Sequence, residues 1–335
     1  MRKELYICHT PYHLLIAMVK ALLSERDSEL ILCASDYIGD AVIQRVRQSD
    51  IFERIETFPN LDKKAKELDF SVPVLKRRRA LQGQLDEWVG REKTEHGEIY
   101  IFNDSSVWGR WLNSHKISYH LLEDGLNCFR FPTFLTYATP GNPLKRAIKR
   151  RMGIDFANFG QSRFTKSIEV NDKNGILLSS AKVVEVPRKD LYACLSTEDK
   201  KRILDAFLSV AEQERILAYA KGDVMLLITQ PLSEDGYTTE EGKLELYREL
   251  VTQYGTDTVL IKIHPREKTD YGDLGKNCIT LQLDNVPLEV LTFLEGLKIK
   301  RAVTTFSTAI EALDFCEERI SLGLEETKKR LKKYE

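Results

Sequence analysis

The sequence is poor in the features that define several specialised classes of protein. Its 335 residues include six cysteines, and none of them forms a C-x-x-C pair or a cluster of the kind that binds zinc or builds a disulfide framework. The longest apolar run near the N-terminus, residues 14–19, is shorter than a signal-peptide core or a membrane span. These absences predict a cytoplasmic protein without a transmembrane segment.

The chain also lacks an excess of charge and the commonest nucleotide-binding fingerprints. It has 50 Lys and Arg against 51 Asp and Glu, a formal net charge of -1. A nucleic-acid-binding protein is expected to be strongly basic, so the balance argues against such a partner. Neither G-x-x-x-x-G-K-[ST] nor G-x-G-x-x-G occurs, which argues against ordinary ATPases and dinucleotide-binding enzymes. We expect no metal site.

What the sequence does contain is an alternation of short apolar runs with segments of helical spacing. Its opening residues pass from a strand at 5–8 to a helix, with Thr10 as the N-cap and Pro11 as the first helical residue. Further strands are predicted at residues 30–34, 98–102, 118–122, 183–186, 224–229, 258–263, 301–305 and 319–322. Further helices are predicted at residues 108–112, 197–219, 240–254, 288–294 and 307–315.

This alternation predicts an α/β protein built from two halves with mostly parallel sheets. We place an N-terminal Rossmann-like domain at residues 1–160, a connecting segment at 161–220, a second Rossmann-like domain at 221–320 and a basic C-terminal helix at 321–335. In open α/β sheets, ligands bind outside the carboxyl ends of the strands. Polar residues that directly follow strands are therefore the candidates for function.

One such group is the segment HLLEDGLN, in which Glu123 and Asp124 follow an apolar strand. Gly125 permits a turn that presents a carboxylate at the strand end, where it could act as a general base. An ordinary Asp-Gly turn is the alternative interpretation. A second Glu-Asp-Gly, at residues 234–236, lies several residues beyond its strand and is interpreted as a surface turn.

A second group is the segment VLIKIHPREK, in which His264 ends an apolar strand. Pro265 keeps the preceding residue extended. A histidine fixed there can donate a proton to a leaving phosphate or neutralise its charge, and Arg266 favours an anion nearby. The alternative is a partly buried histidine that is hydrogen-bonded to a backbone carbonyl.

A third group lies at the starts of two predicted helices. In RAVTTFSTAIEAL, Ser307 and Thr308 begin a helix whose hydroxyls, amides and dipole could bind an anion, although simple N-capping by Ser307 would explain the same residues. Glu289 follows Pro287 and could accept both hydroxyls of a ribose. A carboxylate in a first helical turn is also favourable to the helix dipole alone.

Six segments, in this order and at these positions, resemble the bacterial sialyltransferases of glycosyltransferase family 52. They are TPYHLL, LLEDG, TQPLSEDG, KIHPRE, the P-x-E of residues 287–289 and FSTA, and they extend from residue 10 to residue 309. The resemblance implies a GT-B architecture, with two Rossmann-like domains facing across a cleft. It also implies that the C-terminal half holds most of the donor, CMP-sialic acid.

The resemblance implies a role for each candidate residue. Asp124 would be the catalytic base, and His264 would assist the departure of CMP. Glu289 would bind the cytidine ribose, and Ser307 with Thr308 would bind the phosphate. The complete donor-binding set is Thr10, Gln230, Pro265, Glu289, Ser307 and Thr308, and the supporting set is Glu123, Gly125 and Arg266.

The expected activity is that of an inverting sialyltransferase. It would move sialic acid from CMP-sialic acid to a terminal galactose-type acceptor of a bacterial capsule or lipooligosaccharide. No metal or other cofactor is expected, because a monophosphate leaving group needs less stabilisation than a diphosphate. Two alternatives stay open, a transferase of the same fold that uses another nucleotide sugar and a non-catalytic GT-B-like subunit of polysaccharide assembly.

Basic clusters at residues 75–79, 145–151 and 328–333 have two interpretations. They could be solvated helix faces, or they could attach the protein to the anionic inner face of the bacterial membrane. The family resemblance favours peripheral attachment, because its acceptors are lipid-linked there. A homodimer is compatible with the sequence.

Overall fold

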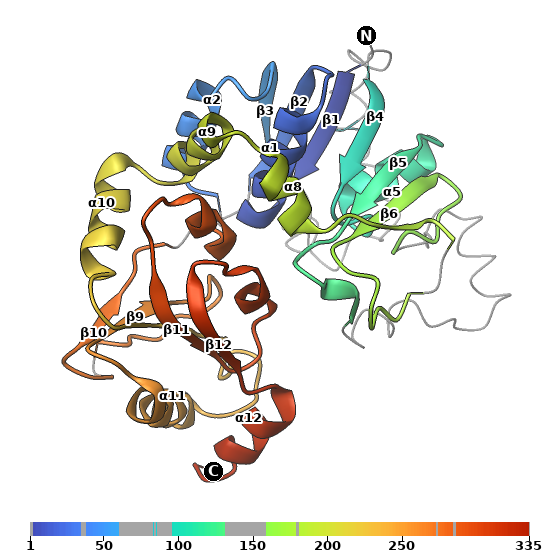
Figure 1. The fold of residues 1–335 in the computed structure, drawn as a ribbon. Coiled ribbons are helices and arrows are strands. Elements are labelled where there is room, and N and C mark those ends of the chain that lie inside the picture. Colours follow the sequence, from blue (N-terminus) through green and yellow to red (C-terminus); the bar gives the residue numbers. More distant parts are fainter. Residues whose placement is uncertain are drawn as a thin grey trace, which may run out of the picture. The chain divides into compact units, whose positions relative to one another are not determined.

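The computed structural model describes residues 3–34, 38–59, 83, 85, 96–130, 159–178, 181–272, 274–283 and 286–334. Contacts within the chain define two compact units. The first comprises Met1–Ile38 and Arg47–Ser196, and the second comprises Gly39–Val46 and Thr197–Glu335. Each unit contains one sheet of parallel strands (Figure 1). This arrangement confirms the α/β class that the alternating pattern predicts.

The sheet of the first unit has seven strands in the order β3-β2-β1-β4-β5-β6-β7. The strands are β1 Lys3–Cys8, β2 Ser28–Ala34, β3 Arg54–Pro59, β4 His96–Ile101, β5 Tyr119–Leu122, β6 Thr165–Val170 and β7 Val183–Glu185. The chain builds outward from β1 to β3 and then continues on the other side with β4. The topological switch point, where ligands bind in such sheets, therefore lies between β1 and β4.

Helices of the first part of the chain follow the strands closely. They are α1 Pro11–Leu23, α2 Asp40–Gln48, α5 Val107–Ser114, η1 Cys128–Arg130 and α8 Arg188–Cys194. The start of α1 is as predicted, with Pro11 in the first turn and the Thr10 hydroxyl accepting a hydrogen bond from the backbone N–H of His13 at 3.2 Å. The strand that leads into it is thus joined to the helix by two residues.

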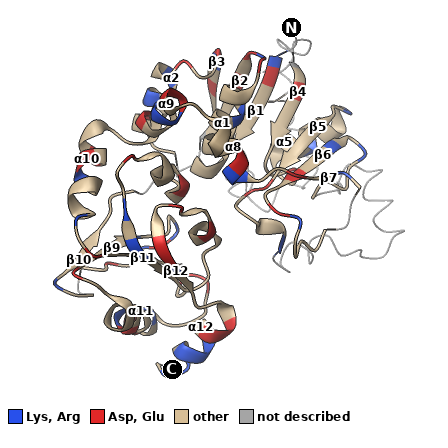
Figure 2. Ribbon diagram, viewed as in Figure 1, with Lys and Arg blue, Asp and Glu red and all other residues tan. Residues whose placement is uncertain are grey.

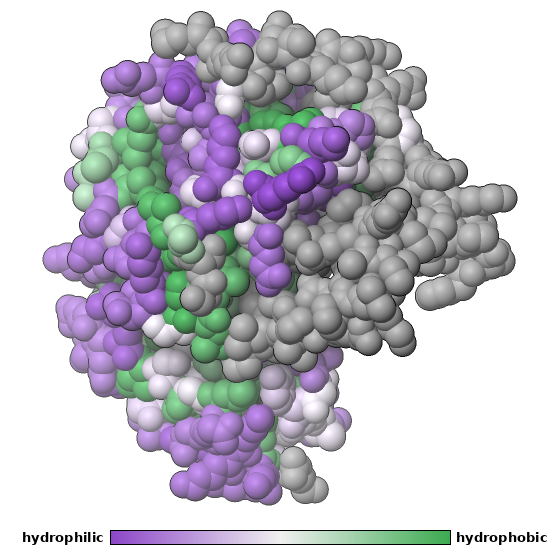
Figure 3. Space-filling view, turned by 90° about the vertical axis from the view of Figure 1, so that its right-hand side faces the viewer, coloured by the Kyte–Doolittle hydropathy of each residue, from purple (hydrophilic) through white to green (hydrophobic). Residues whose placement is uncertain are grey.

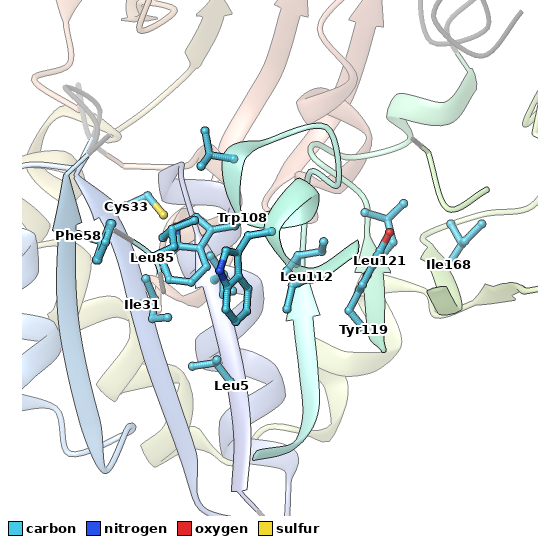
Figure 4. Packing of buried hydrophobic residues seen from close by; sticks show 14 of the residues in the cluster. Leu5, Ile31, Cys33, Phe58, Leu85, Trp108, Leu112, Tyr119, Leu121 and Ile168 are labelled. Atoms are coloured by element: carbon cyan, nitrogen blue, oxygen red, sulfur yellow. The ribbon is translucent and has the colours of Figure 1, made fainter. Parts of the chain in front are cut away.

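The first sheet carries a hydrophobic core on one face (Figure 4). Leu5, Ile31, Leu121 and Ile168 project from four different strands, and Trp108 packs against them from α5. Each fully buried Leu or Ile contributes about 1.5–3 kcal/mol to stability. The core thereby holds the strand ends, and the polar residues that follow them, on a rigid support.

The sheet of the second unit has five strands in the order β10-β9-β8-β11-β12. The strands are β8 Val224–Ile228, β9 Thr258–Lys262, β10 Cys278–Thr280, β11 Ile299–Thr304 and β12 Cys316–Ser321. The helices are α9 Thr197–Phe207, α10 Val210–Tyr219, α11 Glu240–Tyr254, η2 Leu288–Phe293, η3 Thr308–Ala312 and α12 Leu324–Leu331. The switch point of this sheet lies between β8 and β11.

The structure differs from the predicted elements in the middle of the chain. The segment 161–220, predicted as a connection, provides β6 and β7 to the first sheet and α9 and α10 to the second unit. The predicted long helix 197–219 is two helices, because Ser209 caps α10 in a reciprocal capping box with Glu212. Arg45 completes the end of α9 by donating to the carbonyls of Ala206 and Phe207 at 3.1 and 2.6 Å.

The predicted helices at residues 288–294 and 307–315 are short 3₁₀ helices, η2 and η3. The predicted basic helix at the C-terminus is present as α12, with acidic residues in its first turn and basic residues in its last turn (Figure 2). Its three basic side chains have acidic partners, in the pairs Lys328–Glu325, Lys329–Glu326 and Arg330–Glu249, and Lys333 beyond the helix also pairs with Glu249. The basic clusters at 75–79 and 145–151 lie outside the described residues.

Within the part of the chain that the structure describes, no helix combines the length and apolarity needed to cross a bilayer. On the face drawn in Figure 3, hydrophilic and hydrophobic residues are interspersed over the described surface.

Candidate active site

The carboxylate of Asp124 lies two residues beyond the end of β5, as the sequence predicts. Its Oδ1 is 2.5 Å from Nε2 of His13, and its Oδ2 accepts a hydrogen bond from Nδ2 of Asn103 at 3.3 Å. His13 comes from α1 and Asn103 follows β4, so three segments converge at the carboxyl edge of the sheet. The Asp124 side chain is 34% exposed, which leaves room for a substrate hydroxyl to reach it.

The neighbouring Glu123 has a different environment. Its side chain is completely buried, and its Oε2 accepts a hydrogen bond from the backbone N–H of Asn171 at 2.8 Å. Burial raises the pKa of Glu123, against the effect of the Asn171 amide and the buried Arg188 guanidinium, which lower it. Glu123 therefore ties the ends of β5 and β6 together, and Asp124 is the accessible carboxylate of the pair.

The turn after these carboxylates does not use glycine as the sequence suggests. Gly125 has no positive φ, whereas Asn127 adopts the left-handed conformation with φ 56°. Asn is one of the residues that tolerate this region. Gly125 is thus not required by the backbone conformation of this turn.

His13 lies in the TPYHLL segment that the sequence singles out, but its contact with Asp124 was not predicted. Its Nδ1 accepts a hydrogen bond from the backbone N–H of His9 at 3.2 Å, and its ring stacks on Phe102 with centroids 4.2 Å apart. The available signal was a polar residue within the apolar stripe of α1. Although His9 and His13 have the spacing of a metal-binding pair, no group of three or more candidate ligands occurs among the described residues.

In the second unit, His264 follows β9, as predicted, and is half-buried. Its Nδ1 accepts a hydrogen bond from the backbone N–H of Arg266 at 3.2 Å. Burial lowers the pKa of His264 to about 4, and the charges of Arg266 and Lys262 lower it further. The ring is therefore neutral at neutral pH with its proton on Nε2, which makes Nε2–H a hydrogen-bond donor.

Next to His264 lies the buried carboxylate of Glu267, which belongs to the KIHPRE segment but was not predicted to support the histidine. Oε1 of Glu267 accepts hydrogen bonds from the backbone N–H of His264 at 3.1 Å and from the hydroxyl of Thr229 at 2.6 Å. Oε2 accepts from the hydroxyl of Tyr271, and the ammonium of Lys243 lies 3.9 Å away. Both charged side chains are fully buried, so Glu267 links the ends of β8 and β9 from below.

The turn at residues 234–236 is more than a surface turn, because it binds the loop after β9. Asp235 forms a two-pronged ion pair with Arg266, at 2.6 and 2.9 Å. Glu234 accepts hydrogen bonds from the ammonium of Lys243 at 3.0 Å and from the backbone N–H of Lys268 at 3.1 Å. The charge of Arg266, predicted to favour an anion, is thus already paired.

Two of the predicted donor-binding residues lie in different elements of the second unit, Gln230 just after β8 and Glu289 in η2. The backbone N–H of Gln230 donates to the hydroxyl of Tyr247 at 2.7 Å, and its side-chain amide donates to the carbonyl of Thr229 at 2.9 Å. Glu289 begins η2 and is 5% exposed. Burial raises its pKa to about 7, against the lowering effects of a backbone hydrogen bond and of the Lys262 charge.

The other predicted donor-binding residues are less distinctive. Ser307 and Thr308 follow β11 and are half-buried, but η3 has five residues and the Ser307 side chain makes no capping hydrogen bond. The predicted α-helix N-terminus with its dipole is therefore absent. Thr10 serves as the N-cap of α1, and Pro265 is exposed beside His264. Asp124 belongs to the first unit and His264 to the second.

Comparison with solved structures defines the class of protein. The GT-B domain of a sialyltransferase from Photobacterium damselae aligns with a TM-score of 0.51 at 10% identity, over 96% of this chain and 100% of that one. A UDP-GlcNAc 2-epimerase from Methanocaldococcus jannaschii, solved with UDP-GlcNAc and UDP, aligns with a TM-score of 0.56 at 14% identity, over 99% and 91%. At such identities the likeness concerns the fold alone, which is the α/β GT-B fold.

Sequence comparison gives the family. The model of glycosyltransferase family 52 matches residues 49–322. A protein of Haemophilus influenzae, described only as uncharacterized, is 32% identical over 231 residues, which are 69% of this chain and 70% of that protein. The chain belongs to glycosyltransferase family 52, and it is a glycosyltransferase. The resemblance found in the short sequence motifs is confirmed at this level.

Proposed function

We propose that the protein is an inverting sialyltransferase that moves sialic acid from CMP-sialic acid to a terminal galactose-type hydroxyl of a bacterial capsule or lipooligosaccharide. The observation that carries the proposal is the accessible Asp124 carboxylate, held by two hydrogen-bond donors at a strand end in a chain of family 52. Sialyltransferases are among the structures with similar folds, which supports this donor.

Asp124 acts as the general base. It removes the proton from the acceptor hydroxyl as the hydroxyl oxygen forms a bond to the anomeric carbon of sialic acid. The bond from that carbon to the phosphate oxygen breaks, and its electron pair leaves with CMP. Because attack and departure occur on opposite faces of one carbon, a single displacement inverts the anomeric centre. General base catalysis of this kind contributes about 10²- to 10⁴-fold.

His264 assists the leaving group by hydrogen bonding. The low pKa of the ring keeps it neutral, and the contact of Nδ1 with the Arg266 amide leaves the proton on Nε2. The Nε2–H of the neutral ring can therefore donate a hydrogen bond to a phosphate oxygen at neutral pH. Negative charge that develops on the phosphate strengthens this hydrogen bond as CMP departs, and the neutral ring keeps its proton on Nε2.

The remaining candidates surround the rest of the nucleotide. Glu289 binds the ribose hydroxyls, and Ser307 with Thr308 contacts the phosphate. We propose that no metal takes part, since CMP is a monophosphate leaving group. Membrane attachment at the inner leaflet belongs to the same proposal, but α12 contributes little to it because most of its basic side chains are already paired.

The test is calorimetric titration of the full chain with CMP, CDP, UDP and GDP, each with and without EDTA. We expect selective binding of CMP that EDTA does not change, followed by transfer from CMP-sialic acid to a galactose-terminated acceptor. Preference for a nucleoside diphosphate would replace the proposal by a transferase of another nucleotide sugar. No binding of any nucleotide would indicate the non-catalytic subunit.

A further inference from the structure

The tautomer of His13 is determined by its surroundings. Nδ1 accepts the hydrogen bond from the backbone N–H of His9, and a nitrogen that accepts carries no proton. The proton of the neutral ring is therefore on Nε2, which lies 2.5 Å from Oδ1 of Asp124 and 3.3 Å from its backbone oxygen. His13 is thus a donor to Asp124.

The ring of His13 is also held in place before any substrate arrives. Its side chain is 1% exposed, and it lies nearly parallel to the Phe102 ring, at an angle of 6°. Its backbone N–H is bound by the hydroxyl of Thr10, at the first turn of α1. The direction of Nε2–H is therefore set by the junction of β1 and α1, together with the residue that follows β4.

The second oxygen of Asp124 has a weaker contact. Oδ2 accepts from Nδ2 of Asn103 at 3.3 Å, which is longer than the contact at Oδ1. Oδ1 of Asn103 accepts from the backbone N–H and the hydroxyl of Ser105 at 2.9 and 2.6 Å, so the orientation of the amide is fixed. Oδ2 is thus the oxygen whose lone pairs are the more available to a substrate.

We propose that His13 is a positioning residue for the base. It holds Oδ1 of Asp124 and turns Oδ2 toward the acceptor hydroxyl, and it remains an Nε2–H donor throughout the reaction. This inference rests on the proposed role of Asp124 as the base. The proton from the acceptor goes to Oδ2, since Nδ1 of His13 is occupied by the His9 amide and Nε2 already carries a proton.

Two other titratable groups near Asp124, His9 and Cys128, do not change charge near neutral pH. Burial lowers the pKa of His9 to about 4, with a further lowering by His13 and an opposing effect of Asp124. Burial raises the pKa of Cys128 to about 12, and the charges of Glu123 and Asp124 raise it further. Glu123 is buried and bound to a backbone amide. The pH dependence of variants at His13 therefore reports on the contact with Asp124.

The kinetic test compares His13→Leu and His13→Gln with a matched control, His115→Leu. His115 also stacks on an aromatic ring, that of Trp111 at 4.4 Å, but belongs to the end of α5. We expect H13L to lower kcat about 10²-fold, the cost of a misplaced reacting group, and to move the acid limb of the pH–rate profile to higher pH. H13Q, whose amide N–H can replace Nε2–H, should recover most of kcat.

A second measurement does not depend on turnover. Nuclear magnetic resonance of the full chain with isotope-labelled histidine should find His13 protonated at Nε2 only, with a resonance that moves in Asp124→Asn. A proton on Nδ1, or kinetics of H13L equal to those of H115L, would overturn the inference. If H13L does not fold, H13Q and the spectra decide. If the wild type transfers nothing, the proposed function fails while the spectra still test the contact.

Discussion

Asp124 and His264 both follow strands of parallel sheets, yet the two units hold them by different means. In the first unit, the side chains of His13 and Asn103 bind the carboxylate oxygens themselves. In the second unit, Glu267 binds the backbone N–H of His264 and leaves Nε2 of the ring to the substrate. Substituting the residues that contact Asp124 should therefore slow the chemical step. Substituting Glu267 should mainly lower the stability of the loop that carries His264.

The largest effect is expected from Asp124→Asn. Asn has the same size and can still accept the hydrogen bond from His13, but it cannot take up the proton of the acceptor. Transfer should fall by about 10²- to 10⁴-fold, while the affinity for CMP in calorimetry stays nearly unchanged. Asp27→Asn is the matched control, because Asp27 is exposed and precedes β2 at the opposite edge of the sheet. Near-native turnover of D124N would remove Asp124 from the role of base.

A smaller effect on turnover, and a larger one on stability, is expected from Glu267→Gln. The Lys243 ammonium keeps Glu234 at 3.0 Å and Glu240 at 3.1 Å, so the cost comes from the hydrogen bonds that Glu267 accepts from Thr229, His264 and Tyr271. Weakening these buried bonds should lower the free energy of unfolding by about 1–3 kcal/mol in urea denaturation. Turnover should fall only about tenfold, because the side chain of His264 still presents Nε2–H. Glu241→Gln, at an exposed position of α11, is the control. A large loss of kcat with unchanged stability would show that Glu267, like the partners of Asp124, acts on the chemical step.

The strand ends could be predicted from the sequence because apolar runs stop abruptly where polar residues begin. Leu122 before Glu123 and Ile263 before His264 are such boundaries, and Thr10 with Pro11 marks a helix start by local chemistry alone. β6 was not predicted, since its residues Lys166 and Ser167 interrupt the apolar pattern at a half-exposed end of the strand.

The partners of the candidate residues could not be predicted in the same way. The contact of His13 with Asp124 joins residues 111 positions apart, and it exists only because α1 packs near the end of β5. Glu267 stands beside basic residues in the sequence, which suggested an anion site. Its burial against Lys243 depends on how α11 packs on the sheet, and this packing cannot be predicted from the residues near Glu267 in the sequence.

The smallest effect is expected from Glu289→Gln, which should raise the stability of the protein in alkaline solution and lower its affinity for CMP. Burial raises the pKa of Glu289 from its ordinary 4.5 to about 7, so the ionised form is disfavoured in the folded state. Its stabilising contribution is present below pH 4.5 and is lost as the pH rises through about 7. E289Q should therefore be more stable than the wild type in alkaline solution and equally stable in acid, by thermal unfolding.

The affinity of E289Q for CMP should nevertheless fall about tenfold, the value of a hydrogen bond between a carboxylate and a ribose hydroxyl. Glu295→Gln, at an exposed position just beyond η2, should change neither property. If E289Q gained stability and kept its affinity for CMP, Glu289 would have no part in nucleotide binding, and the donor site would have to be sought among the residues after β8 and β11.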